Sequence, residues 1–252
     1  MFTISRRFAL LVGLVSVFAI PSGASANHSW NGYHWARTAN PFTLKVGDNV
    51  SSTWDSILAT TTSDWSKSTV LDTTVVAGGA KRRQCRPTAG RDEVCNGTYG
   101  NNGWLGVASI WVTGGTHITQ GTVKVNDTYF NTPTYNTTAW RNLVMCQEVG
   151  HTLGLDHQDE NFNNPNLGTC MDYTSSPGTN QHPNQHDYDQ LVTIYSHLDS
   201  TSTVGAAPSK GAALNARSAW GREVATSHGG RTSTFVRELG GHQMVVTFVI
   251  WA

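Results

Sequence analysis

The chain has 252 residues, enough for one substantial domain with a hydrophobic core and a small appendage. Its 17 Lys and Arg side chains balance 17 Asp and Glu side chains, so it has no basic field of the kind that holds nucleic acid. The one strongly apolar run, from Phe8 to Ile20, is shorter than the roughly 20 residues that a membrane span requires.

The first 26 residues have the pattern of a secretory signal peptide. Arg6 and Arg7 precede the apolar run, and the small residues Ala24, Ser25 and Ala26 stand where a signal peptidase would cut. We therefore expect a signal peptide at 1–26 and a mature chain that is secreted, monomeric and not held in a membrane.

The pattern of apolar residues beyond this segment predicts an α+β domain at 27–200. We expect a strand at 41–50 and then an amphipathic helix, because five residues recur at helical spacing: Trp54, Ile57, Leu58, Thr61 and Trp65. Further strands are expected at 70–76, 104–112 and 116–125. A second helix is expected at about 138–153, ending before Gly154, and a third at 184–198.

The end of the chain predicts a separate small element. Residues 201–216 are rich in Ser, Thr, Gly and Ala, which is typical of a linker. Two strand-like runs, 234–239 and 244–251, flank Gly240 and Gly241 and predict a β-hairpin within a C-terminal extension at 217–252. Since a lone hairpin is marginally stable in water, we expect it to pack on the main domain or to extend a sheet edge.

Four cysteines in an exported chain predict two disulfides, for which three pairings are possible. We favour Cys85 with Cys95, which closes a polar loop, and Cys146 with Cys170, which ties the second helix to the region just before Met171. The alternative, a structural zinc site, lacks the C-x-x-C spacing that would support it.

The segment from Gln147 to His157 carries residues that suit a catalytic metal ion. On a helix, Gln147 and His151 lie one turn apart on the same face, with Glu148 turned about 100° away. Gly154 lets the chain turn sharply, so that His157 returns as a third ligand. A zinc ion held there would acidify a bound water molecule, and Glu148 would act as the general base.

This segment resembles the long H-E-x-x-H-x-x-G-x-x-H motif of the metzincin zinc proteases, with Gln147 in place of the first histidine. Downstream, the run from Cys170 to Tyr173 is similar to the methionine-containing turn of that family, which includes the astacin, serralysin and matrixin branches. The resemblance covers 146–173. It implies a metzincin-like fold: a twisted mixed β-sheet, an active-site helix, a Met-turn and a C-terminal helix, here with the small hairpin added.

The same resemblance implies roles for two further residues. Met171 would form an apolar floor beneath the metal, and Tyr173 matches a tyrosine that stabilises the oxyanion in astacins and serralysins.

Glutamine at position 147 departs from the family pattern. Its Oε1 has the same number of bonds to Cα as the Nε2 of histidine, but an amide oxygen is a poorer donor for zinc. Three interpretations stay open. The ligands are Gln147, His151 and His157, with Tyr173 as a possible fourth; or a distant histidine replaces the glutamine, from the set His117, His182 and His186; or the fold has lost catalysis and survives as an inactive binding or adhesion protein.

The intact Glu148 favours the active interpretation, a secreted zinc-dependent endopeptidase that hydrolyses protein or peptide substrates. An extended substrate is expected to pair with an edge strand within 116–126. The remaining histidines are expected at the surface: His28, His34, His197, His228 and His242.

Overall fold

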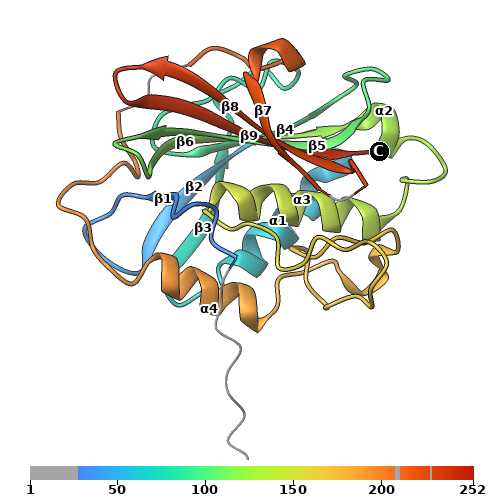
Figure 1. The fold of residues 1–252 in the computed structure, drawn as a ribbon, viewed down its shortest axis with the longest axis horizontal. Coiled ribbons are helices and arrows are strands. Elements are labelled where there is room, and N and C mark those ends of the chain that lie inside the picture. The colour runs from blue at the N-terminus through green and yellow to red at the C-terminus, as the bar shows by residue number, and fades with distance from the viewer. Residues whose placement is uncertain (1–27, 208–210, 228) are drawn as a thin grey trace, which may run out of the picture.

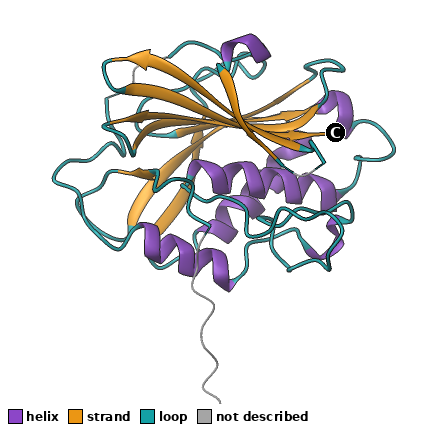
Figure 2. Cartoon of the chain, in the orientation of Figure 1, coloured by secondary structure: helices purple, strands orange, loops and turns teal. Residues whose placement is uncertain are grey.

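The computed structural model describes residues 28–207, 211–227 and 229–252. The expected signal peptide, residues 208–210 of the expected linker and His228 lie outside the described residues. The described chain is an α+β fold in which one twisted, mixed sheet lies over a layer of helices (Figures 1 and 2). None of the described helices is long and apolar enough to cross a membrane.

Most of the sheet is a single path of strands in the order β3-β2-β4-β6-β5-β9-β8-β7. The strands are β2 (Phe42–Asn49), β3 (Leu71–Ala77), β4 (Asp92–Gly97), β5 (Trp104–Thr113), β6 (His117–Asn126), β7 (Arg222–Thr226), β8 (Thr232–Gly240) and β9 (Gln243–Trp251). The short β1 (His34–Trp35) pairs with the start of β6. Pairing is parallel from β3 to β6 and antiparallel from β6 to β7, as the expected mixed sheet requires.

The helices α1 (Ser52–Trp65), α3 (Thr138–Thr152) and α4 (Gln185–Ile194) lie on one face of this sheet (Figures 1 and 2). The short helix α2 (Asp127–Phe130) directly follows β6. Single 3-10 turns lie at Pro177–Thr179 and, on the other side of the sheet, at Arg217–Ala219. The Thr137 side chain caps α3 by accepting a hydrogen bond from the Trp140 backbone N–H at 3.2 Å. The main core lies between α1, α3 and the sheet, and its largest members include the fully buried Trp35, Trp54 and Trp65.

The helix α4 and the strand β4 are two of the elements that differ from the sequence-based expectation. The helix α4 ends at Ile194 rather than near residue 198, because Tyr195 leaves the helix to pack on Phe42 and to donate its hydroxyl to the Leu153 carbonyl at 3.0 Å. The strand β4 has no apolar alternation, since it buries polar groups that find partners elsewhere. Its Glu93 is 2.6 Å from the Arg91 guanidinium.

Both expected disulfides, Cys85–Cys95 and Cys146–Cys170, are present. Cys95 lies on the buried strand β4, so the first disulfide joins a loop to the sheet rather than closing a polar loop. The second joins α3 to the residue before Met171, and therefore fixes the helix to the chain that follows it.

The C-terminal strands continue the main sheet. The strand β9 pairs antiparallel with β5 over almost its whole length, from Trp104 opposite Trp251 to Thr113 opposite Gln243. The expected hairpin of β8 and β9 thus extends the sheet at β5, and β7 adds a third strand. A second apolar cluster covers the face of these strands that points away from α3, formed by Trp104, Val107, Trp111, Leu214, Trp220, Phe235, Val245 and Val249. The division of the chain into a domain, a linker and an extension stays a prediction.

The expectation that 116–126 forms an edge strand is wrong. These residues form β6, which is paired with β4 on one side and β5 on the other, so its edges are not free for a substrate. The sequence pattern shows that a strand exists but not which neighbours it pairs with.

Candidate active site

The helix α3 holds Gln147, Glu148 and His151 in the interior of the protein. Their side chains are 1%, 0% and 0% exposed. Glu148 points at β5, where an added Cβ on Gly106 would lie 2.5 Å from Glu148 Oε1 and 2.6 Å from Val144. A glycine at position 106 therefore gives the carboxylate the space it occupies between helix and sheet.

The chain turns at the end of α3 and brings His157 back to His151. Gly154 has φ +97°, and a Cβ there would lie 2.1 Å from the Tyr33 carbonyl oxygen, so this position requires glycine. The His151 and His157 ring centroids are 4.6 Å apart. His151 Nδ1 lies 2.9 Å from the Leu155 carbonyl, which can only accept, so Nδ1 carries the proton and Nε2 has a free lone pair.

Several buried oxygen and nitrogen atoms of these side chains have no hydrogen-bond partner among the described residues. They are Gln147 Oε1, both carboxylate oxygens of Glu148, His151 Nε2 and both ring nitrogens of His157. His157 Nδ1 lies 3.3 Å from Asp156 Oδ1, an ion-pair distance without hydrogen-bond geometry. Buried polar atoms nearly always have a hydrogen-bond partner, so these unpaired atoms need an explanation. Two imidazoles and an amide oxygen are a set of ligand atoms that fits a zinc ion.

Met171 packs against α3, and Tyr173 packs against the ring of His157. Met171 is fully buried beneath α3, and a Cβ on Gly150 would lie 2.6 Å from its sulfur. The Tyr173 ring centroid is 4.1 Å from that of His157. Its hydroxyl is 2.5 Å from Thr232 Oγ1 on β8, so in this structure the group is engaged by the C-terminal strands.

Burial dominates the electrostatics of these residues. Burial raises the pKa of Glu148 well above its ordinary value, and the approach of the Ala108 backbone offsets part of that shift without forming a full hydrogen bond. Burial, with the neighbouring His157, lowers the pKa of His151 to about 3. His151 is therefore neutral at physiological pH, which is the form of imidazole that binds a metal.

The C-terminal strands cover this group of side chains. Phe248 on β9 lies opposite Ala108 of β5, and its ring centroid is 4.0 Å from that of His151 and 4.6 Å from that of His157. A cavity of about 170 Å³ reaches His157 and Tyr173, and strands β7 to β9 form much of its wall. Glu148 is fully buried and does not line this cavity.

The alternative ligands His117, His182 and His186 have other partners. His117 Nε2 is 3.2 Å from Asp199, His182 Nδ1 is 2.6 Å from Asp64, and His186 stacks on His28 at 5.0 Å. The expectation that His28 and His34 lie at the surface is wrong, since they are 3% and 5% exposed. Both rings are held between segments far apart in sequence.

Sequence reasoning missed three residues of this site. A glycine inside a strand pattern often marks a close approach of another element, so Gly106 had a detectable signal. Phe248 and Thr232 had none, because their contacts depend on where the C-terminal strands pair.

Comparison with known proteins gives little further information. No family model and no curated protein sequence matches the chain. Among solved structures, the chain is similar to high choriolytic enzyme 1 (HCE-1), a hatching enzyme zinc-protease from the medaka fish Oryzias latipes, with 10% identity and a TM-score of 0.36. The match covers 65% of this chain and 94% of that chain.

Proposed function

We propose that the protein is a secreted zinc-dependent endopeptidase of the metzincin type, with Gln147, His151 and His157 as the metal ligands. The supporting observation is the group of buried donor atoms without partners, which comes from these residues and Glu148. An unpaired buried polar group costs about 1–3 kcal/mol, so several together are costly unless an ion satisfies them. The two disulfides suit an oxidising, extracellular compartment.

The roles of the surrounding residues follow from their positions. A bound zinc ion would polarise the peptide carbonyl and lower the pKa of a water molecule. Glu148 would take a proton from that water molecule and return it to the leaving amine. Tyr173 would donate to the substrate carbonyl oxygen once its hydroxyl leaves Thr232. Met171, packed under Gly150, would support the metal-binding part of α3.

We further propose that the folded chain is latent. In this fold the outer edge of β5 is the place where an extended substrate would pair beside Glu148, and β9 occupies that edge. The Phe248 ring also lies against both histidines that we assign as ligands. Hydrolysis therefore requires displacement of β9.

The second candidate is a catalytically inactive binding or adhesion protein on the same fold. The observation that favours it is the same closure of the site by β9 and Phe248. If the closure is permanent, the C-terminal strands are a structural part of the sheet and no substrate reaches Glu148.

The two candidates differ in their response to release of the C-terminal strands. A recognition sequence for a specific protease, inserted after Ala207, allows the connection to β7 to be cut in the folded protein. Cutting followed by dilution lowers the effective concentration of β9 at β5. We expect the uncut chain to be inactive and the cut, diluted, zinc-loaded chain to hydrolyse casein, with activity lost in a metal chelator.

Two variants control this assay. Glu148→Gln should abolish hydrolysis in the cut chain, whereas Glu160→Gln should retain it, because Glu160 is an exposed carboxylate 3.9 Å from His157 with no assigned proton-transfer role. A cut chain in which β9 has demonstrably dissociated, and which binds zinc without hydrolysing casein, supports the inactive binding protein instead.

A further inference from the structure

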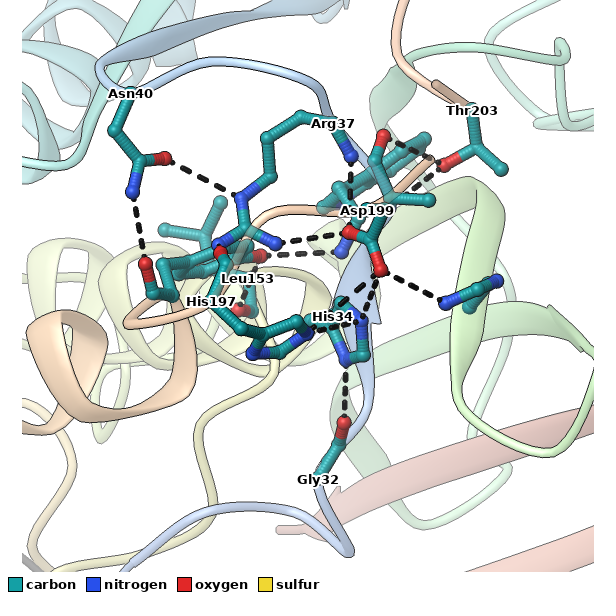
Figure 3. A network of polar contacts seen from close by, with 12 residues as sticks. Gly32, His34, Arg37, Asn40, Leu153, His197, Asp199 and Thr203 are labelled. Atoms are coloured by element: carbon teal, nitrogen blue, oxygen red, sulfur yellow. Dashed lines mark hydrogen bonds and ion pairs between the residues drawn. The ribbon is translucent and has the colours of Figure 1, made fainter. Parts of the chain in front are cut away.

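A second group of metal-ligand side chains lies where the N-terminal segment meets the chain after α4 (Figure 3). His34 Nε2 is 3.2 Å from His197 Nε2 and 3.6 Å from Asp199 Oδ1. His197 Nε2 is 3.7 Å from the same carboxylate oxygen. Two imidazole nitrogens and one carboxylate oxygen thus point at a common place.

These separations match the spacing of ligand atoms around zinc. With metal–ligand bonds of about 2.0–2.1 Å, neighbouring ligands of a tetrahedral ion lie about 3.3 Å apart. The observed distances of 3.2, 3.6 and 3.7 Å therefore describe one triangular face of such a tetrahedron.

The contacts behind these ligands orient them for metal binding. His34 Nδ1 lies 2.7 Å from the Gly32 carbonyl, so Nδ1 carries the proton and Nε2 presents a lone pair to the group. Asp199 Oδ2 accepts hydrogen bonds from the Arg37 backbone N–H at 3.1 Å and the Arg37 guanidinium at 2.9 Å. Oδ1 is left to face the histidines. Hydrogen bonds of this kind commonly fix the ligands of metal sites.

A third histidine borders the group. His117, at the start of β6, has its Nε2 3.2 Å from Asp199 Oδ1, and its ring centroid is 5.0 Å from that of His34. Its side chain is 33% exposed. It is therefore a candidate donor for a fourth coordination position, which water can otherwise fill.

We propose that His34, His197 and Asp199 bind a divalent transition-metal ion of the zinc class, with His117 beside the fourth position. Imidazole-rich sets prefer zinc and its neighbours, whereas calcium and magnesium take oxygen ligands. Such an ion would join β1 to the chain after α4, and it would also join the start of β6 where His117 fills the fourth position. The proposal does not depend on the peptidase function.

A pair of matched histidine variants tests this proposal in the full mature chain. His197 and His182 are both 51% exposed and both lie beside an aspartate, but His197 Nε2 also lies 3.2 Å from the Nε2 of a second imidazole, that of His34. After equilibration with zinc and removal of free metal, His197→Ala should hold one equivalent less than the unmodified chain. His182→Ala should hold the same amount as the unmodified chain.

A spectroscopic measurement on the same proteins excludes a trivial folding defect. Cobalt(II) in place of zinc should give a visible absorption band. This band should weaken in His197→Ala and in Asp199→Asn but not in His182→Ala. The circular dichroism spectrum of His197→Ala should match that of the unmodified chain, because the His197 side chain is half-exposed. The cobalt affinity of the site in His197→Ala should fall at least about tenfold. Equal metal content and equal spectra in all four proteins would overturn the proposal and leave the group as a hydrogen-bonded network around Asp199.

Discussion

Gln147 presents an amide oxygen where imidazole would be the stronger zinc ligand, so its substitution tests the ligand assignment. In a His197→Ala background, which removes the second proposed site, Gln147→His should retain or tighten zinc binding. Gln147→Ala should weaken it by about tenfold or more. The measurement is a competition titration against a chromophoric chelator. An unchanged affinity in Gln147→Ala means that another residue fills this position.

Gly106 leaves space for Glu148, and a methyl group there should be costly. A Cβ would lie 2.5 Å from Glu148 Oε1 and 2.6 Å from the stiff, branched Val144. Gly106→Ala should lower the free energy of unfolding by about 1–3 kcal/mol, as overpacking of a buried site does. Gly178→Ala is the control, because nothing lies within 4 Å of its Cβ position. Equal stabilities of the two variants in urea titrations would show that helix and strand can separate freely.

Asp92 gives the protein a specific dependence on pH. Burial raises its pKa from 3.8 to about 7, the Thr152 hydroxyl opposes the shift, and Glu93 adds to it. Because the folded state binds the proton more tightly than the unfolded state, this contribution to stability is fully present below pH 3.8 and is lost as the pH rises through about 7. Asp92→Asn keeps an acceptor for Thr152 and removes the titration.

The stability of Asp92→Asn relative to the unmodified protein should therefore increase across that range of pH. Urea denaturation at a series of pH values measures the difference, with the exposed Asp72→Asn as control. A difference that stays constant with pH would mean that the Asp92 carboxyl does not titrate in this range.

At the scale of the elements, the pairing of β9 with β5 decides whether the candidate active site is open. Ser109 and Thr247 are directly paired on these strands, their side-chain oxygens are 2.9 Å apart, and they lie on the face away from α3. A disulfide formed by Ser109→Cys with Thr247→Cys should hold β9 in place without touching the proposed ligands. The crosslinked chain should stay inactive after cutting at the inserted site, whereas a double alanine variant should become active. Equal casein hydrolysis by both would remove β9 as the cause of latency.

Elements with a local pattern were predictable from the sequence. The buried stripe of α1 and the cap and spacing of α3 depend on residues within a few turns, and the structure has both helices close to the expected bounds. The strand β4 was missed because it buries Asp92 and Glu93. These carboxylates accept hydrogen bonds from Thr152 and Asn49, which are 60 and 44 positions away in sequence. The strand β7 was missed because all its residues are exposed, so it has no apolar alternation.

In the molecule as a whole, too, local features were predictable from the sequence and contacts between distant segments were not. The arrangement of Gln147, Glu148 and His151 follows from helical spacing. Gly154 indicates the turn that brings His157 close to His151. The closure by Phe248 and the meeting of His34 with His197 join residues more than 90 positions apart. Such contacts are set by the order of strands in the sheet, which short-range patterns do not specify.

The proposed function requires that Gln147, His151 and His157 hold a zinc ion beside Glu148. Crystals of the zinc-loaded mature protein, measured on either side of the zinc absorption edge, locate the ion directly through its anomalous scattering. We expect an anomalous peak at coordinating distance, about 2 Å, from His151 Nε2, a ring nitrogen of His157 and Gln147 Oε1. Zinc-loaded crystals with no peak among these three side chains, or with a peak there that Gln147 does not contact, would contradict it.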